Sequence, residues 1–123
     1  MRWLLLFAIG CTSQSLPASN TRLFQSDIDE LILCTNGGFV MNVAVEAYVR
    51  AGHYSQDPST DSTVTGVAIE GTTGTVAFHY RIDSGGLHAD ELGSAAWTEV
   101  GALDPPNGTP AGQCSNLEMR SWW

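Results

Sequence analysis

The stretch from Thr63 to Asp83 sets the strongest limit on the fold. It reads VTGVAIE, then GTTG, then TVAFHYRID, so two alternating segments flank a glycine-rich turn. In the second segment Val76, Phe78, Tyr80 and Ile82 share one face of an extended chain. Alternation with a period of two predicts a β-hairpin with one buried face.

Other segments extend this pattern along the chain. The segment Phe39–Arg50, FVMNVAVEAYVR, alternates in the same way and predicts one long strand, followed by a polar loop at 51–62. Residues 95–103, AAWTEVGAL, predict a further strand, and the alternation of Leu117 and Met119 predicts a last one. Short strands, glycine-rich turns and the lack of a long helical period indicate an all-β fold, a small antiparallel β-sandwich.

Residues 26–34, SDIDELILC, allow two interpretations. Ser26 with Asp29 three residues later favours one short N-terminal helical turn. The segment LILC followed by TNGG favours a strand from Leu31 to Cys34 that enters a hairpin turn. The strand is the preferred reading, either alone or after one helical turn.

Charge excludes several function classes. The 123 residues, enough for one domain, include 13 acidic side chains, five arginines and no lysine, for a formal net charge of −8. Such a chain repels phosphate backbones, so no nucleic-acid partner is expected. Schiff-base chemistry through lysine is excluded.

The first residues carry the features of an export signal. In residues 1–10, MRWLLLFAIG, one arginine precedes an apolar run that is too short to cross a bilayer. The segment from Ala8 to Cys11 resembles the lipobox of bacterial lipoprotein signals. That resemblance implies that Cys11 becomes a lipidated N-terminus, while simple cleavage after Ser13 or Ala18 is the alternative. Residues 11–25 then form a polar tether, and residues 26–123 form the single β-sandwich domain.

The two remaining cysteines, Cys34 and Cys114, lie near opposite ends of the predicted domain. Export implies an oxidising compartment, in which an even number of cysteines pair by default. The sequence therefore predicts a Cys34–Cys114 disulfide.

The motif Asp83-Ser84-Gly85-Gly86 resembles the segment around the nucleophile of trypsin-like serine proteases, and His53 and Asp57 or Asp61 precede it in the same order. Ile82 stands where that motif has glycine, and the chain is about half the length that the two-barrel fold needs. A strand that ends in a glycine-rich turn accounts for the motif. We therefore expect that Ser84 is not a nucleophile and that the protein is not an enzyme.

The titratable side chains contain no recognised metal motif. His53, His79 and His88 form no i, i+2 or i, i+4 pair, and Asp57 and Asp61 lack the spacing of a calcium loop. We expect no metal and no cofactor. His79 is expected on the outer face of its strand, beside Arg81 and Asp83.

Aromatic residues offer a binding hypothesis. A platform on which a sugar stacks needs exposed aromatic rings, and its candidates are Trp97, Trp122, Trp123, Tyr48 and Tyr54. Packing in the core is the alternative for the same residues. By the parity of the predicted last strand, Trp123 packs on the core and Trp122 faces outward.

Taken together, the sequence predicts an exported surface or periplasmic β-sandwich module with a binding or structural role, anchored in a membrane through Cys11. Its location is the bacterial cell envelope, or outside the cell if Cys11 is removed. Carbohydrate or another surface protein is the expected partner. The alternatives are a dedicated carbohydrate-binding module, a self-assembling surface subunit and, last, a small hydrolase.

Overall fold

The strands follow one another as antiparallel hairpins. The structure is a computed structural model that describes residues 21–44, 48–58, 62–100 and 110–123. Its strands are β2 (Arg22–Ser26), β3 (Asp29–Leu33), β4 (Gly38–Val43), β5 (Tyr48–Pro58), β6 (Val64–Glu70), β7 (Val76–Asp83), β8 (Gly86–His88) and β9 (Thr98–Val100). Two helical elements accompany them, the 3₁₀ turn η2 (Asp90–Leu92) and the helix α1 (Pro110–Leu117).

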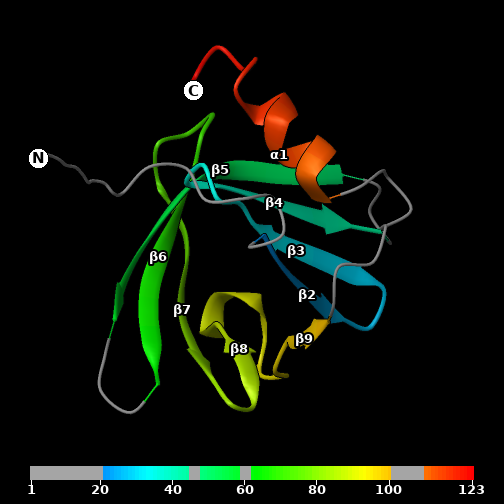
Figure 1. Ribbon diagram of the computed structural model, residues 1–123, viewed down its shortest axis with the longest axis vertical. Helices are drawn as coiled ribbons and strands as arrows, with labels where there is room; N and C mark the ends of the chain where they lie inside the picture. The colour runs from blue at the N-terminus through cyan, green and yellow to red at the C-terminus, as the bar shows by residue number, and fades with distance from the viewer. Residues whose placement is uncertain (1–20, 45–47, 59–61, 101–109) are drawn as a thin grey trace, which may run out of the picture.

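All eight strands belong to one sheet, in the order β8-β7-β6-β5-β4-β3-β2-β9. The end strands approach each other, because Leu87 of β8 and Trp97, just before β9, exchange two backbone hydrogen bonds of 2.8 and 2.7 Å. The sheet therefore curls into a nearly closed barrel (Figure 1). The all-β antiparallel class expected from the sequence is confirmed, and the layers that face each other across the core are parts of one curled sheet.

Large apolar side chains fill the barrel interior. Phe24, Phe39 and Phe78 are fully buried there, and Phe39 meets Phe78 edge to face with ring centroids 5.5 Å apart. The inward face of β7 carries Phe78, Tyr80 and Ile82, as the alternation predicts, whereas Val76, expected on the same face, is 47% exposed. Trp97 also lies in this cluster and is 4% exposed.

A second apolar cluster lies outside the barrel, on the outer face of β2 to β5. Its sheet residues are Leu23, Ile32 and Val40, and Leu117 of α1 packs on them. Gly38 makes room for this contact, because a Cβ there would stand 2.5 Å from Leu117 Cδ1 and the Leu117 side chain would have to shift. In Figure 1 the orange helix α1 lies beside β4 and β5.

The disulfide predicted from the sequence is confirmed, and it joins the helix α1 to the sheet. Cys34 and Cys114 are bonded, with their Cα atoms 5.7 Å apart. Both cysteines are buried within the second cluster. The bond therefore holds α1 against the sheet.

The interpretation of residues 26–34 resolves in favour of strands. β2 and β3 form a hairpin in which Ser26 pairs with Asp29, and Asp27 takes a positive φ of 58° in the turn. No helical turn forms at Ser26, and the helical elements of the described residues are η2 and α1 instead. β2 begins at Arg22, so the sheet includes the last residues of the range expected for the tether. Asp and Asn tolerate the left-handed region better than other side chains, so the Ser-Asp pattern that resembles a cap serves a tight turn here.

The long strand predicted for 39–50 is wrong, and so is the loop predicted for 51–62. β4 ends at Val43, and β5 begins at Tyr48 and continues to Pro58. The polar residues of β5 pair with β6 along the register from Gly52–Glu70 to Pro58–Val64. The hairpin predicted for 63–83 is confirmed by β6 and β7. Polar composition misled the prediction because one face of a barrel strand meets solvent.

The last predicted strand is wrong as well, since Leu117 ends a helix. Pro110 opens α1, a position that suits proline because the first N–H of a helix has no partner. Leu117 is 2% exposed while Met119 is 84% exposed, so the two residues do not share a buried face.

The parity assigned to the final tryptophans is reversed. Trp122 is half-buried and packs on the second cluster, where a Cβ on Gly71 would collide with its indole ring. Trp123 is 37% exposed and stacks on His53 with centroids 4.5 Å apart. Both differences follow from a tail that leaves a helix instead of a strand.

Candidate functional site

The turn between β7 and β8 is built by the motif Asp83-Ser84-Gly85-Gly86. Asp83 Oδ1 accepts a hydrogen bond of 2.8 Å from the backbone N–H of Gly85. Gly86 has a φ of 115°, which a residue with a Cβ rarely adopts. An aspartate that bonds the backbone two residues on is a recurrent turn device, so the motif forms a turn for local reasons.

A hollow of about 380 Å³ opens beside this hairpin, between β7, β8 and η2. We name it the β7–η2 cleft. It is lined by His79, Tyr80, Arg81, His88, Asp90 and Glu91. The outward residues of β7 reach it together with side chains of β8 and η2, so three segments contribute to one surface hollow.

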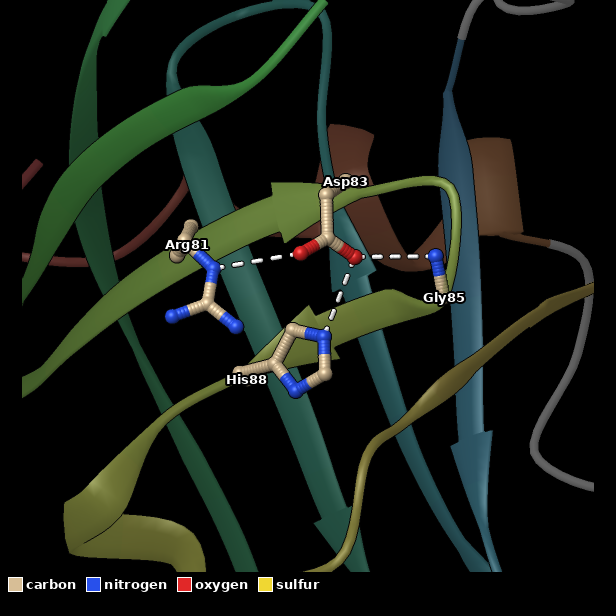
Figure 2. Close-up of polar contacts among 4 residues, drawn as sticks. All are labelled: Arg81, Asp83, Gly85 and His88. Atoms are coloured by element: carbon tan, nitrogen blue, oxygen red, sulfur yellow. Dashed lines mark hydrogen bonds and ion pairs between the residues drawn. The ribbon is translucent and has the colours of Figure 1, made fainter.

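Asp83 connects three groups at one end of the β7–η2 cleft (Figure 2). Its Oδ1 lies 3.1 Å from His88 Nε2, and its Oδ2 accepts a hydrogen bond of 3.2 Å from Arg81 Nε. Because an ionised carboxylate only accepts, His88 Nε2 carries the proton and donates it. In the neutral form of the ring Nδ1 is an acceptor, and Figure 2 shows this nitrogen pointing away from Asp83.

Glu91 contacts His79, the second histidine that lines the cleft. Its Oε2 lies 2.8 Å from His79 Nδ1, and its Oε1 accepts a 3.1 Å hydrogen bond from the backbone N–H of His79. That N–H lies on the edge of β7 that β8 does not reach, since β8 pairs only with Arg81, Ile82 and Asp83. Glu91 therefore caps an exposed strand edge and orients His79 at the same time.

The two carboxylates that hold the histidines are both stabilised in their charged form. The backbone N–H of Gly85 and then the His88 ring lower the pKa of Asp83 below its ordinary value. The His79 side chain is the largest cause that lowers the pKa of Glu91. At neutral pH both acids are ionised and keep the rings in place.

The protease-like arrangement is not brought together. Along the sheet register His53 lies level with Ile69 and Val76, at the start of β7, whereas Ser84 follows the end of that strand. At about 3.3 Å per residue along β7, these positions are roughly 26 Å apart. A serine, a histidine and an acid within hydrogen-bond reach are required for that chemistry, so His53 does not serve Ser84.

The metal hypotheses find no support in the geometry. Residues 21–44, 48–58, 62–100 and 110–123 contain no group of three or more His, Cys, Asp or Glu placed to hold a metal ion. Asp57 pairs with Thr65 in the sheet. Asp61 lies outside the described residues, so the calcium hypothesis has only one of its two acids in view.

The five aromatic residues proposed for stacking do not form one platform. Trp97 lies in the barrel interior, and the Tyr54 hydroxyl donates a 2.7 Å hydrogen bond to the backbone carbonyl of Cys34. Trp122 and Trp123 gather with His53 at the C-terminal tail. The side chain of Tyr48 lies outside the described part. Trp97 does not belong to an exposed stacking platform, because its backbone pairing with Leu87 places its ring in the barrel interior.

Sequence reasoning identified the side chains of this cleft only in part. His79, Arg81 and Asp83 were expected on one outer face, which their alternation gives directly. The pairing of Glu91 with His79 was not expected, because it depends on η2 folding back across β7. Cys11 lies outside the described residues, as does the segment 101–109 that precedes α1.

Comparison with protein-family models, with curated proteins and with solved structures finds no match for this chain. Within the described residues no helix has the length and apolar character needed to cross a membrane.

Proposed function

We propose that the protein is an exported binding module, anchored through Cys11, that binds a small polar ligand in the β7–η2 cleft. The observation that carries the proposal is the mutual fixing of the polar side chains in the cleft. Asp83 holds His88 and Arg81, and Glu91 holds His79, so the lining is oriented before any ligand arrives. Pre-oriented groups lower the entropic cost of binding.

The barrel interior supports a site on the outer surface. Barrels of eight strands either fill with side chains or enclose one small ligand. Here Phe24, Phe39, Phe78, Leu87 and Trp97 take up that space. Ligand contact is therefore assigned to the outer face, where β7, β8 and η2 leave a hollow.

The Cys34–Cys114 bond supports export, because structural disulfides persist in oxidising compartments. The lipid anchor is tested on the full chain by replacing Cys11 with Ala. We expect the mature mass to lose the lipid and the protein to leave the membrane fraction. Unchanged mass and partitioning would contradict the anchor and leave the cleft proposal standing.

Binding at the cleft is tested by ¹⁵N-resolved NMR on the folded protein with a panel of small polar molecules. We expect saturable shifts of the backbone amides of His79, Arg81, His88 and Glu91 with at least one member. His88→Ala should weaken this response, while Gln56→Ala, an exposed change on β5, should not. Shifts confined to the tail around Trp123 would instead favour a sugar platform there.

The hydrolase alternative has its own test. Ser84→Ala should leave any hydrolytic activity unchanged, and serine-directed phosphonates should not label the protein. Stoichiometric labelling at Ser84 would overturn the assignment as a binding module. The third alternative, a self-assembling subunit, would be recognised by large, salt-tolerant oligomers in size-exclusion chromatography.

A further inference from the structure

The groups that line the β7–η2 cleft keep unused capacity for hydrogen bonds. Arg81 uses only Nε, toward Asp83, and its two terminal nitrogens have no partner in the described part of the chain. In Figure 2 these nitrogens point away from Asp83. The Asp90 carboxylate has no hydrogen bond or ion pair to any described side chain, although its backbone carbonyl accepts the N–H of Gly93. An unused guanidinium end and an unused carboxylate thus line one hollow.

Ligands of a single charge fit this lining poorly. An anion would meet Arg81 but also the carboxylates of Asp90 and Glu91, with Asp83 directly behind the guanidinium. A metal cation would meet Arg81, and the described side chains supply no set of three ligands for it. Each unit charge placed beside a like charge is repelled, so one end of the cleft opposes either ligand.

A neutral sugar also fits poorly. Sugar sites depend on an exposed aromatic face in addition to hydrogen bonds. The only aromatic carbocycle that lines the cleft is Tyr80, which is 4% exposed and donates its hydroxyl to the backbone carbonyl of Ser55. The lining is therefore ionic, and its free groups have opposite signs.

We propose that the β7–η2 cleft binds a small zwitterion of the α-amino acid type, with its carboxylate on the terminal nitrogens of Arg81 and its ammonium group on Asp90. This inference rests on the proposed function of the cleft as a binding site. Planar guanidinium groups bind carboxylates with two parallel hydrogen bonds. An ammonium group supplies three donors, and the Asp90 carboxylate and the Nδ1 atom of His88 supply acceptors.

The composition of the chain agrees with this ligand. With no lysine in the sequence, the protein has no side-chain ammonium group of its own to neutralise Asp90. The hollow of about 380 Å³ has room for one such molecule. Arg81 is 52% exposed, and charge pairs at exposed sites each contribute little to affinity. Affinity is accordingly weak, with Kd on the order of 10 mM.

The test titrates the folded protein with glycine and, separately, with acetate and methylammonium, its two halves. The readout is the shift of the backbone amides of Arg81, Asp90 and Glu91. We expect glycine to saturate, and each half to bind roughly fivefold more weakly, because each lacks one charge pair. Glycylglycine, which holds its charges further apart, should also bind more weakly than glycine.

Two variants and two matched controls localise the contacts. Arg81→Gln and Asp90→Asn should each weaken glycine binding roughly fivefold, and Arg81→Lys should restore part of the loss. Arg120→Gln and Asp27→Asn change the same residue types at exposed positions that do not line the cleft, and should leave binding unchanged. Well-dispersed spectra of all five variants establish that they fold.

The outcomes separate the two proposals. If acetate or methylammonium binds as tightly as glycine, or if Asp90→Asn has no effect, the zwitterion assignment is wrong. If another panel member such as glucose saturates the cleft amides while glycine does not, that assignment is wrong and the binding function stands. If no member shifts the cleft amides at tens of millimolar concentration, both proposals are overturned.

Discussion

The outer surface of the barrel is divided into two regions that start from the same strand pattern. Across β2 to β5 the outward side chains include Leu23, Ile32 and Val40, and α1 covers them. Across β7 and β8 the outward side chains are His79, Arg81 and His88, and they remain partly exposed around the β7–η2 cleft. Inward residues are apolar in both regions, so the outward residues alone decide which side is covered.

The pKa values of carboxylates shift in opposite directions in the two regions. Glu30 faces outward on β3 in the covered region and is 6% exposed, and burial raises its pKa above the ordinary value. Asp83 and Glu91, in the open region, have pKa values lowered by hydrogen bonds. Covering a face contributes stability but penalises charge, whereas the open face keeps charge at little cost. The covered region thus contains the buried apolar contacts and the disulfide, and the proposed binding site lies in the open region.

Removing the disulfide should give the largest effect and tests whether the covered region carries the stability. The bond closes a loop with a sequence separation of 80 residues. The double change Cys34→Ser and Cys114→Ser should lower the free energy of unfolding by on the order of 4 kcal/mol. Urea unfolding measures the loss. Ser84→Ala in the open region is the comparison and should stay within about 0.5 kcal/mol. A loss below about 1 kcal/mol for the cysteine pair would contradict the claim that the covered region carries most of the stability.

Truncating the helix contact comes next. Leu117→Ala removes a side chain that is 2% exposed and should cost about 3 kcal/mol. Met119→Ala, two residues further along the same tail, removes a side chain that is 84% exposed and should cost less than about 0.5 kcal/mol. Chemical denaturation of both variants is the measurement. Equal costs would mean that α1 does not cover the sheet as described.

The two final tryptophans refine the boundary of the covered region. Trp122→Ala should cost about 2 kcal/mol, less than for a fully buried tryptophan, because the ring is half-buried over Gly71. Trp123→Ala should cost roughly half as much, because that ring is more exposed and stacks on His53. Thermal unfolding ranks the pair. The reverse order would restore the parity expected for a terminal strand.

A neutral substitution of Glu30 tests the pH response of the covered region. Since its pKa is raised in the folded state, Glu30 contributes stability that is complete below its unfolded pKa, about 4.3, and is lost as pH rises through the folded value. Glu30→Gln should therefore stabilise the protein at pH 7 relative to wild type, with the advantage vanishing toward pH 4. The measurement is the free energy of unfolding of both proteins between pH 4 and pH 7. Destabilisation at pH 7 would show that the charged form is favoured.

The open region should respond in the opposite sense and with the smallest amplitude. The lowered pKa values of Asp83 and Glu91 contribute stability above their unfolded values, about 4, that is lost as pH falls through the folded values. Asp83→Asn and Glu91→Gln should cause small losses at pH 7 that disappear in acid. Asp57→Asn, an exposed acid on β5, serves as the control. A loss that grows in acid would contradict the assigned pairing.

Local patterns in the sequence determined much of this molecule. The hairpin of β6 and β7 follows from a period of two around GTTG, and its inward residues Phe78, Tyr80 and Ile82 follow from the same alternation. The turn at Asp83 and Gly86 follows from residue types that favour a tight reversal. Pairing of Cys34 with Cys114 follows from their being the only two left in the expected domain. Each of these depends on neighbours along the chain or on simple counting.

Tertiary contacts decided the rest, because they join residues that no local pattern connects. Closure of the sheet depends on the meeting of Leu87 with Trp97, and this meeting turns Trp97 from a candidate ligand contact into a core residue. The C-terminal segment packs as a helix on the apolar outer face of the sheet, where the disulfide and Leu117 hold it. The β7–η2 cleft exists because η2 folds back over an unpaired strand edge, where Glu91 takes the place of a missing strand. Alternation specifies which side of each strand is buried, but only the packed molecule determines what covers the other side.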